Sequence, residues 1–198
     1  MIYLERDGVV IRDMGEGDPG ALAAAEAAQG WHATPEKYLG RLRDSAAGRC
    51  AALAAELNGE AVGYVSLYFE PLAGPYRGIP EIVDFGVLEK CRRRGIGMLL
   101  MDAAEALAAR RSDRVCLAVG LHSGYGSAQR LYAKRGYIPD GSGVWYRDEP
   151  CEPYGACAND DDLVMYLCKE FQFGELRSTN WNFPNLHPIP LVFPGVCC

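Results

Sequence analysis

The dipeptide Asn58-Gly59 is the feature that most constrains the fold of this chain. It separates two apolar runs, 50–57 and 61–69, each with the length and composition of a β-strand. Asn-Gly readily adopts the positive φ angles of a two-residue hairpin turn. The two runs are therefore predicted to pair as antiparallel neighbours, and the rest of the fold has to be built around that pair.

Helical and strand-like segments alternate on both sides of this hairpin. We expect strand 9–14, helices 20–29 and 35–47, strands 50–57, 61–69 and 82–88, helix 97–111, strand 115–119, helix 127–135, and strands 143–146 and 163–168. Asp18 and Thr34 are the expected N-caps of the first two helices, with Pro19 as the first helical residue. A strand–helix–strand crossover added to the hairpin predicts an α/β fold, in which helices cover the faces of a mixed sheet.

Length and composition favour one domain followed by a different C-terminal segment. A chain of 198 residues, of which 49% are hydrophobic, can bury the core of one domain, which we place at residues 1–171. Residues 172–198 contain four prolines and isolated aromatic residues without a period. We interpret them as an irregular tail that is disordered, packs on a partner or was acquired at a cloning junction.

Charge and cysteine spacing argue against several classes of protein. A formal net charge of −6 and a pI near 5.1 argue against nucleic-acid binding, which needs a basic face, and suit a cationic substrate. The N-terminal residues carry charges and no apolar run reaches the length of a membrane span, so we expect no membrane partner and a cytoplasmic location. The eight cysteines form no C-x-x-C pair, which favours free thiols over a metal site.

A basic, glycine-containing turn joins the strand at 82–88 to the following helix. The run 92–97 reads Arg-Arg-Arg-Gly-Ile-Gly. A helix start presents unpaired amide groups and the positive end of the helix dipole, both of which attract phosphate, and glycines let the backbone approach an anion. A dinucleotide fingerprint would need glycine in place of Leu100, and a Walker loop needs a G-K-[ST] sequence that is absent. The turn predicts a diphosphate site, with a solvated basic turn as the alternative.

Two motifs resemble those of the GNAT superfamily of acetyl-CoA-dependent N-acetyltransferases. R-x-x-G-x-G after an aliphatic strand end is the family's acetyl-CoA signature, matched by Arg92, Gly95 and Gly97. The run 128–137 is similar to the family block A-x-x-L-Y-x-K-x-G-[FY]. The resemblance covers about 9–170 and implies a GNAT-like mixed, mostly antiparallel sheet with helices on both faces, and acetyl-CoA as cosubstrate. It implies the following residues for binding acetyl-CoA: Val87, Arg92, Arg93, Arg94, Gly95, Ile96, Gly97, Met98, Ala128 and Tyr132.

The implied activity is transfer of an acetyl group to the primary amine of a small-molecule acceptor. The strand 82–87 and the turn 124–126 resemble motifs of aminoglycoside acetyltransferases, so we expect an aminoglycoside-like acceptor, with antibiotic resistance as its consequence, or a polyamine. The alternatives are a protein lysine or N-terminal acetyltransferase and a non-catalytic CoA-binding module. Tyr125 departs from the family pattern, because many members have an asparagine there that contacts the pantetheine arm. The oligomeric state is open, with a homodimer as one option.

Two carboxylates before the basic turn, Asp84 and Glu81, are candidates for the general base. An amine with a pKa of about 10.4 is almost wholly protonated at neutral pH, so its attack requires a proton acceptor. Asp84 is preferred because it matches the aspartate of the aminoglycoside-enzyme strand motif, and a water chain is an equal alternative. Three residues apart on a regular strand, the two carboxylates face opposite sides unless a bulge intervenes.

The resemblance also implies the remaining chemistry. Tyr132 is the expected proton donor to the leaving thiolate, and a main-chain N–H near Val87 is the expected oxyanion donor. A covalent acyl-enzyme on Cys91 or Cys116 is the alternative, but no histidine adjoins either cysteine. The acceptor is expected to bind to the first two helices, the loop 70–80 and the segment 140–162, with walls from Trp31, Tyr76 and Trp145.

Overall fold

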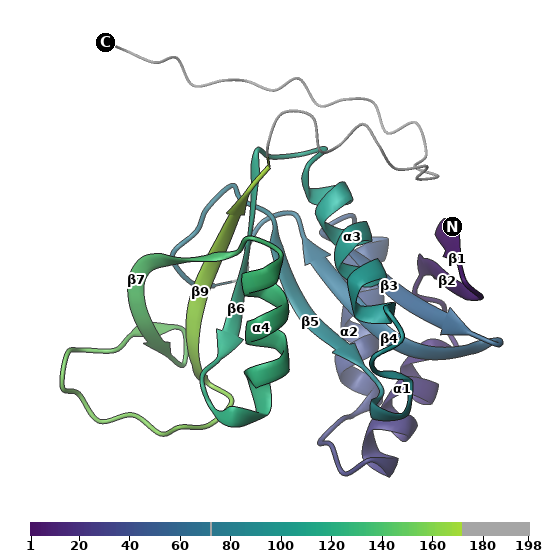
Figure 1. The fold of residues 1–198 in the computed structure, drawn as a ribbon, viewed down its shortest axis with the longest axis horizontal. Helices are drawn as coiled ribbons and strands as arrows, with labels where there is room; N and C mark the ends of the chain where they lie inside the picture. The colour runs from purple at the N-terminus through teal and green to yellow at the C-terminus, as the bar shows by residue number, and fades with distance from the viewer. Residues whose placement is uncertain (72, 172–198) are drawn as a thin grey trace.

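The computed structural model describes residues 1–71 and 73–171, which form one nine-stranded sheet with helices on its faces (Figure 1). The strand order is β1-β2-β3-β4-β5-β6-β9-β7-β8, and neighbours are antiparallel except for β5 and β6. The predicted α/β fold with a mixed, mostly antiparallel sheet is confirmed. The predicted tail at 172–198 lies outside the described residues. Within the described part, no helix has the length and apolar character to cross a membrane.

Four antiparallel strands form the N-terminal half of the sheet: β1 (Ile2–Arg6), β2 (Val9–Asp13), β3 (Cys50–Leu57) and β4 (Glu60–Tyr68). The predicted turn at Asn58-Gly59 is confirmed, with φ angles of 54° and 80°. The expectation of a single strand before the first helix was wrong, because β1 pairs with β2 through a second turn at Asp7-Gly8. β1 was not predicted because it is short and Tyr3 is its only buried residue, so it lacks the alternation that is typical of a half-buried strand.

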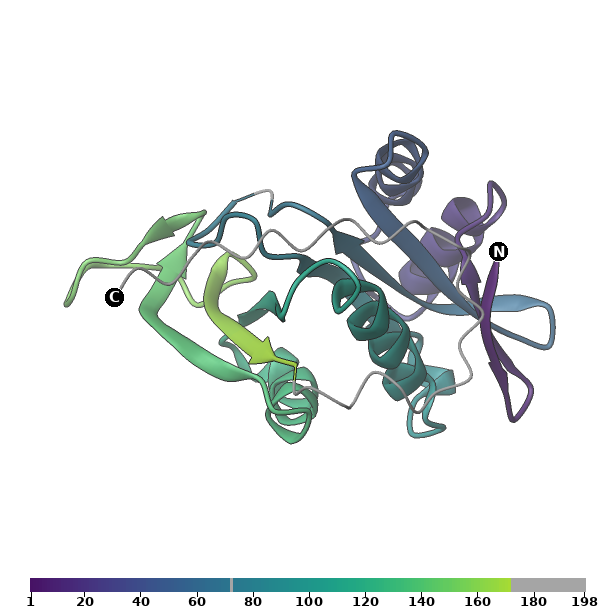
Figure 2. The ribbon, with the colours of Figure 1, turned by 90° about the horizontal axis from the view of Figure 1, so that it is seen from above.

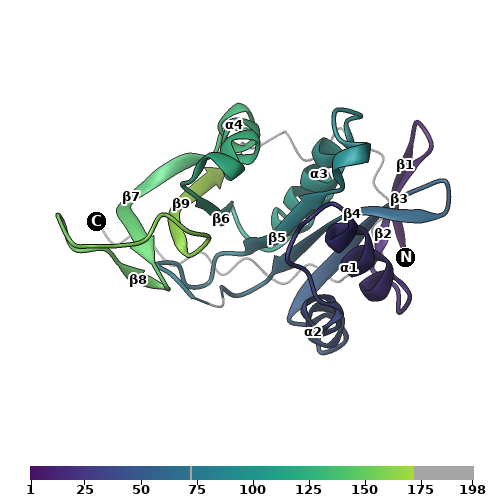
Figure 3. The ribbon, with the colours of Figure 1, turned by 90° about the horizontal axis from the view of Figure 1, so that it is seen from below.

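Helices cover both faces of the sheet (Figures 2 and 3). α1 (Asp18–Ala28) and α2 (Pro35–Ala46) pack on one face, called the front face below, and α3 (Ile96–Ala108) and α4 (Gly126–Lys134) lie on the opposite face. The larger core lies on the α3 side and includes Leu53, Val65 and Leu100, whereas a smaller core on the front face includes Leu22 and Tyr64. The predicted placement of helices on both faces is therefore confirmed.

The first helix starts differently from the prediction. Its N-cap is Gly17, and Asp18 is the first helical residue. The Asp18 carboxylate accepts a hydrogen bond from the Gly15 amide at 2.6 Å and forms an ion pair with Arg12 at 2.6 Å. Thr34 is the N-cap of α2, as predicted, although its side chain forms no capping hydrogen bond. Asp18 therefore ties the helix to β2 instead of capping it.

The C-terminal half of the sheet consists of β6 (Arg114–Gly120), β9 (Leu163–Glu170), β7 (Ile138–Tyr146) and the short β8 (Glu149–Pro150). β7 begins five residues before the predicted strand at 143–146. Its pairing with β9 is interrupted between Pro139 and Val144, where Gly141 and Gly143 have positive φ. This irregularity removes the period-two pattern by which a strand is recognised.

β5 (Glu81–Val87) joins the two halves of the sheet. It is antiparallel to β4 and parallel to β6, but only Glu81 and Ile82 pair with β6, opposite Cys116 and Leu117. Beyond this short contact the two strands separate, and α3 and α4 lie on either side of the separation (Figure 1). The C-terminal end of β5 is therefore without a neighbour on its β6 side, next to the start of α3.

Candidate active site

The turn before α3 is exposed and ends in a left-handed residue. The short 3-10 helix η1 (Glu89–Cys91) follows β5, and Gly95 is the N-cap of α3. The φ of Gly95 is 80°, which favours glycine, and that of Arg93 is 62°. Arg92, Arg93, Arg94 and Gly95 are all exposed. The predicted diphosphate loop is thus open to solvent at the point where β5 loses its neighbour.

The first amides of α3 have no acceptor within the helix. The Leu99 amide is the first to bond back along the helix, to the Gly95 carbonyl oxygen at 3.1 Å. The amides of Ile96, Gly97 and Met98 precede that bond, and no side chain caps them within the described residues. These N–H groups at the positive end of a helix fit the oxygens of a diphosphate.

Gly97 lets α3 approach β5. A Cβ at this position would lie 3.2 Å from Cζ of Phe85 and 3.7 Å from a methyl carbon of Val87. At Gly95, by contrast, a Cβ would meet nothing within 4 Å, and only its φ demands glycine. Glycine is therefore required at the two positions for different reasons: the φ angle at Gly95 and the close contact at Gly97. The contact at Gly97 was not evident from the sequence.

The arginines of the turn differ in their contacts. Arg92 donates from Nε to the Val87 carbonyl oxygen at 3.2 Å, and its guanidinium lies 5.1 Å from the ring centroid of Trp31. Trp31, which was expected to wall the acceptor site, therefore lies beside the diphosphate turn. Met98 is 44% exposed, and its sulfur accepts a hydrogen bond from Arg135 at 3.6 Å.

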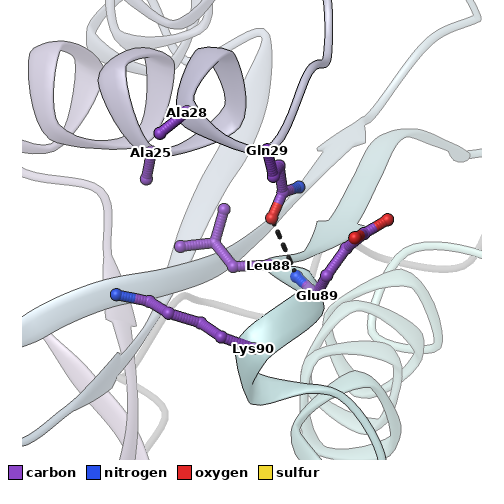
Figure 4. Close-up of a pocket in the computed structure, with 6 residues that line it drawn as sticks. All are labelled: Ala25, Ala28, Gln29, Leu88, Glu89 and Lys90. Carbon is purple, nitrogen blue, oxygen red and sulfur yellow. Dashed lines mark hydrogen bonds between the residues drawn. The ribbon is translucent and has the colours of Figure 1, made fainter.

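A shallow cavity of about 360 Å³ adjoins the turn. It lies between α1 and η1 and is lined by Ala25, Ala28, Gln29, Leu88, Glu89 and Lys90 (Figure 4). Gln29 Oε1 accepts a hydrogen bond from the Glu89 amide at 2.9 Å. Gln29 Nε2 is buried without a partner among the described residues. This cavity is next to the diphosphate turn and not between β5 and β6.

The Val87 amide faces the separated edge of β5. The neighbouring Leu88 amide donates to the Val62 carbonyl oxygen of β4 at 2.9 Å. Successive amides of a strand point to opposite edges, so the Val87 N–H points away from β4. The Val87 carbonyl oxygen accepts from Arg92, on the same side. A backbone donor is thus available where the strands separate.

A β-bulge changes the geometry of the two candidate bases. The pairs Ser66–Val83 and Tyr64–Gly86 enclose one residue on β4 but two on β5, Asp84 and Phe85, and Asp84 has a φ of 54°. Asp84 forms ion pairs with α2, on the front face. Glu81 is directly opposite Tyr68, whose hydroxyl also contacts α2, so it lies on the same face. The opposite-face arrangement of a regular strand therefore does not apply.

The surroundings of Asp84 and Glu81 differ. Asp84 Oδ2 is 2.5 Å from Arg41 Nε, and Oδ1 is 3.7 Å from Lys37 Nζ. Glu81 is 6% exposed and lies where β5 and β6 make their only pairing. Both carboxylates lie on the front face near the strand separation, and Asp84 is paired there with Arg41 and Lys37 of α2.

A buried carboxylate on α1 was missed by sequence reasoning. Glu26 is 2% exposed and accepts hydrogen bonds from the hydroxyls of Tyr38 and Tyr64, each at 2.5 Å. Burial and then the Glu26 carboxylate raise the pKa of both tyrosines, so both hydroxyls remain protonated. The available signal was spacing, because Glu26 shares a helix face with Leu22 and Ala23.

Tyr132 lies on α4 against β5. Its ring centroid is 6.2 Å from that of Phe85 and 5.8 Å from that of Tyr137. Burial, with a smaller effect of Tyr125, raises the pKa of Tyr132, so the hydroxyl keeps its proton at neutral pH. Ala128, one turn earlier, packs against the same core. The structure thus places a protonated tyrosine beside the bulged strand.

Tyr125 contacts Gly120 and the segment that contains Asp161. Its ring packs on Gly120, where a Cβ would lie 2.4 Å from the ring, and its hydroxyl donates to Asp161 at 3.0 Å. His122 is hydrogen-bonded to the same carboxylate at 2.9 Å. The cysteines considered for an acyl-enzyme, Cys91 and Cys116, are buried, and burial raises the pKa of Cys116, which disfavours its thiolate.

The fold, the separated strand pair and the exposed helix start together define an acyl-CoA-dependent transferase. The chain belongs to the acetyltransferase (GNAT) family, whose family model matches residues 21–137. Members of this family use acetyl-CoA, and the protein is accordingly an acetyl-CoA-dependent acetyltransferase. Among curated proteins, no sequence matches the chain.

Solved structures share this fold at low sequence identity. Ard1 from Thermoplasma volcanium is 19% identical, with a TM-score of 0.62, over 84% of this chain and 99% of that one. RimL, a ribosomal L7/L12 alpha-N-protein acetyltransferase, is 14% identical, with a TM-score of 0.65, over 86% and 94%. A GNAT family acetyltransferase from Elizabethkingia anophelis with acetyl-CoA bound is 20% identical, with a TM-score of 0.54, over 84% and 100%. At these identities, the likeness establishes the fold alone.

Proposed function

We propose that the protein transfers the acetyl group of acetyl-CoA directly to a primary amine of a small cationic acceptor, such as a polyamine or an aminoglycoside-like compound. The observation that carries this proposal is the exposed start of α3 beside the separation of β5 and β6. Its amides at Ile96, Gly97 and Met98 have no acceptor within the helix. Acetyl-CoA carries a diphosphate and a thioester. The helix start can bind the diphosphate, and the free backbone donor at the strand edge can stabilise charge on the thioester carbonyl oxygen.

The residues of the turn and of α4 bind acetyl-CoA in this proposal. The amides at the start of α3 hold the diphosphate, and Arg92, Arg93 and Arg94 add positive charge around it. Val87 of β5 and Ala128 of α4, which both pack against the larger core, are the remaining contacts to acetyl-CoA in this proposal. Acetyl-CoA supplies an acetyl group activated as a thioester. The Elizabethkingia anophelis structure contains acetyl-CoA on the same fold, which supports this assignment.

Three groups of this chain carry the chemistry in the proposal. The Val87 N–H stabilises negative charge on the carbonyl oxygen, because it points to the side that β6 has left. Tyr132 donates a proton to the leaving thiolate, because its hydroxyl is protonated at neutral pH and its ring lies against Phe85 of β5. Asp84 or Glu81, both on the front face, accepts the proton of the acceptor amine directly or through water.

The acceptor side has charges and rings that suit a cation. The ring of Tyr166 lies 6.1 Å from that of Tyr76 in the loop 70–80 and 5.3 Å from that of Trp145 on β7. Burial, and then the negative charges of Glu81 and Asp148, raise the pKa of Tyr166 to about 12. Carboxylates and aromatic faces both attract an ammonium group.

A protein N-terminus is the second candidate acceptor. RimL is named as a ribosomal L7/L12 alpha-N-protein acetyltransferase, and a further similar structure, from Brucella melitensis, is a ribosomal-protein-alanine N-acetyltransferase. An α-amino group has a reference pKa of about 7.7–8.0, so it needs a proton acceptor less than an alkylamine does.

The test has a binding step and a transfer step. Calorimetry with CoA should show saturable binding, and free thiol should appear when acetyl-CoA is mixed with one class of acceptor. The panel contains polyamines, aminoglycosides, and peptides with either a free α-amine or a lysine. Turnover of peptides alone would favour the second candidate. Absence of CoA binding would exclude the enzyme assignment, and CoA binding without any transfer would indicate a non-catalytic CoA-binding module.

A further inference from the structure

Two cysteines lie at the ends of a short turn in the segment that connects β7 to β9. This segment, residues 147–162, is called the strap below, and it projects beyond the edge of the sheet (Figure 1). Cys151 directly follows β8, and Cys157 comes later in the same segment. Cys157 is exposed and Cys151 is partly exposed, whereas the cysteines of β3, η1 and β6 are buried. The strap thus carries two thiols that small molecules can reach.

A tight turn between the two cysteines reverses the chain. The Gly155 amide donates to the Glu152 carbonyl oxygen at 2.8 Å. Pro153 is the second residue of this turn, and Tyr154 is the third with a φ of 65°, which is the arrangement of a type II turn. Proline fixes its own φ near the value that the second position requires. The residues that flank such a turn lie on neighbouring legs, and these residues include both cysteines.

The two thiols are in contact. Partial burial, and then a hydrogen bond to Cys157, raise the pKa of Cys151. Cys151 therefore keeps its proton in this contact, and the Cys157 sulfur is the acceptor. The Cys151 amide donates to the Val144 carbonyl oxygen at 2.8 Å, which fixes Cys151 to β7. One sulfur is thus held by the sheet, and the other is exposed beside it.

Gly155 determines how tightly the turn closes. A Cβ at this position would lie 2.9 Å from the Glu152 carbonyl oxygen, which is the acceptor of the turn hydrogen bond. A larger residue would therefore open the turn and move Cys157 relative to Cys151. Glycine keeps the two legs of the turn close together.

We propose that Cys151 and Cys157 form a reversible dithiol–disulfide site, which small-molecule disulfides oxidise and small-molecule thiols reduce. The Cys157 thiolate attacks one sulfur of the external disulfide, which forms a mixed disulfide and releases one external thiolate. The Cys151 thiol then gives its proton to solvent, and its sulfur attacks that of Cys157 and displaces the second external thiolate. Two protein thiols are oxidised, one external disulfide is reduced to two thiols, and the two protons from the protein end on these thiols.

The surroundings of the two cysteines suit this order of attack. The Cys157 sulfur is exposed to an external disulfide, and the hydrogen bond from Cys151 stabilises negative charge on it. The second attack is intramolecular between groups already in contact, so its effective concentration is about millimolar or higher. Neither step involves acetyl-CoA, so the site is independent of the proposed function.

Oxidation closes a ring, residues 151–157, inside the strap. The other end of the strap is already anchored, because Asp161 is hydrogen-bonded to His122 at 2.9 Å and Asp160 accepts from the Tyr146 hydroxyl at 3.1 Å. The ring adds a constraint to the leg that follows β8. Since a closed ring excludes many conformations of an open chain, the oxidised strap should be more rigid than the reduced one.

Mass spectrometry of the full chain after incubation with oxidised glutathione tests the chemistry. The wild type should lose two hydrogens, and its peptide map should join Cys151 to Cys157. Cys151→Ser should instead retain one glutathione on Cys157, because the second attack is missing. Cys157→Ser should react at least about 10-fold more slowly than Cys151→Ser, because the remaining thiol is less exposed and less acidic. A lasting glutathione adduct on the wild type, or a disulfide between other cysteines of the chain, would overturn the site.

Gly155→Ala tests the geometry of the turn. Closure of the ring from the mixed disulfide should slow by about 10-fold, because the added Cβ forces the turn open. Gly20→Ala is the matched control and should close at the wild-type rate, since a Cβ at Gly20 meets nothing within 4 Å. Equal rates in the two variants would contradict the role of the turn in bringing the thiols together.

Limited proteolysis shows whether the ring is closed in the folded chain. Tyr154 is fully exposed, and chymotrypsin, which cleaves after tyrosine, would cut there inside the ring. Under denaturing conditions the cut, oxidised chain should stay in one piece until a thiol reduces it, whereas reduced wild type and Cys151→Ser should give two fragments. The cut should also be slower in the oxidised chain, because the closed ring opens less readily to the protease. Two fragments from the oxidised wild type without a reductant would exclude the disulfide.

Discussion

Single residues of the site have separate tasks in packing and in binding. Gly97 allows α3 to lie against Phe85, whereas Gly95 provides a left-handed turn in open space. Tyr132 combines a buried ring with a hydroxyl that keeps its proton at neutral pH. Substitution of Gly97 tests how the position of the helix start affects CoA binding. Substitution of Tyr132 tests the chemical step.

Gly97→Val should weaken CoA binding by about 10-fold or more. The new Cβ would lie 3.2 Å from the Phe85 ring and force the start of α3 away from β5. Overpacking of this kind costs about 1–3 kcal/mol. Calorimetry with CoA measures the change. Gly20→Ala is the control, because a Cβ at Gly20 meets nothing within 4 Å; equal affinity of Gly97→Val and wild type would contradict the role of this contact.

Tyr132→Phe should lower kcat by about 100-fold and leave CoA affinity nearly unchanged. The substitution removes the hydroxyl that donates the proton, and the ring contacts with Phe85 and Tyr137 remain. Thiol release under saturating acetyl-CoA gives kcat, and a thermal melt checks that the fold is intact. A variant as active as wild type would show that the leaving group takes its proton from elsewhere.

Charged contacts between elements fix their relative positions. Arg135, at the C-terminal end of α4, bonds Glu105 and Asp102 of α3 at 2.8 Å and 2.7 Å, and Lys169 of β9 bonds Glu105 at 2.8 Å. The side chains of Arg135 and Glu105 are 7% and 9% exposed. This network joins the two helices that flank the strand separation. On the other face, Arg12 and Asp18 join β2 to α1.

Arg135→Met should lower the free energy of unfolding by about 3 kcal/mol, because buried Glu105 loses one of its two cationic partners and Asp102 loses its partner. Urea unfolding at neutral pH measures the change. Arg114→Met removes an arginine from an exposed pair with Asp113 and should cost less than about 1 kcal/mol. Similar losses in the two variants would mean that burial of the network contributes little.

The Arg12–Asp18 contact predicts a step in acid unfolding. Burial opposes the charge of Asp18, but the hydrogen bonds from Arg12 and the Gly15 amide offset it and lower the pKa. The folded pKa thus lies below the unfolded value of about 3.9, so its contribution is complete above that pH and is lost as the pH falls through the folded pKa. Urea unfolding between about pH 3 and pH 7 should show a shallower acid loss in Asp18→Asn than in wild type. Parallel curves for the two proteins would refute this contribution.

At the scale of the whole molecule, two halves of a sheet meet at a short junction. β5 pairs with β6 through Glu81 and Ile82 alone, and the larger core continues across the junction under α3. The separation of β5 and β6 beyond this contact is the proposed binding site. The short pairing at Glu81 and Ile82 therefore both joins the two halves of the sheet and borders the proposed site. Residues 1–171 contain every element of this arrangement.

A chain ending at Phe171 should bind CoA and unfold like the full chain. All strands and helices of the described structure end by Glu170. The expected result is a change in Tm below about 2 °C, which corresponds to less than about 1 kcal/mol for a domain of this size. Thermal melts with and without CoA measure both properties. A large fall in Tm or in CoA affinity would show that residues 172–198 belong to the domain.

Local sequence was sufficient to predict two features of the structure. The Asn58-Gly59 hairpin and the start of α3 follow from backbone preferences of a few adjacent residues, and the structure has both. β1 and the early part of β7 were missed, because the first is short, the second is interrupted, and both are stabilised by partner strands. Strand formation there depends on pairing with distant residues, which local periodicity does not reveal.

The sequence by itself determined which groups are available: a glycine-containing helix start, a tyrosine on α4 and two carboxylates before the turn. Only the tertiary structure decided how they meet. The bulge at Asp84 arises from pairing β5 with β4, and it brings Glu81 and Asp84 to one face. The cations on Asp84 come from α2, more than 40 residues earlier, as Arg41 and Asp84 are 43 residues apart. Backbone preferences are local, whereas ion pairs and strand register depend on which distant segments pack together.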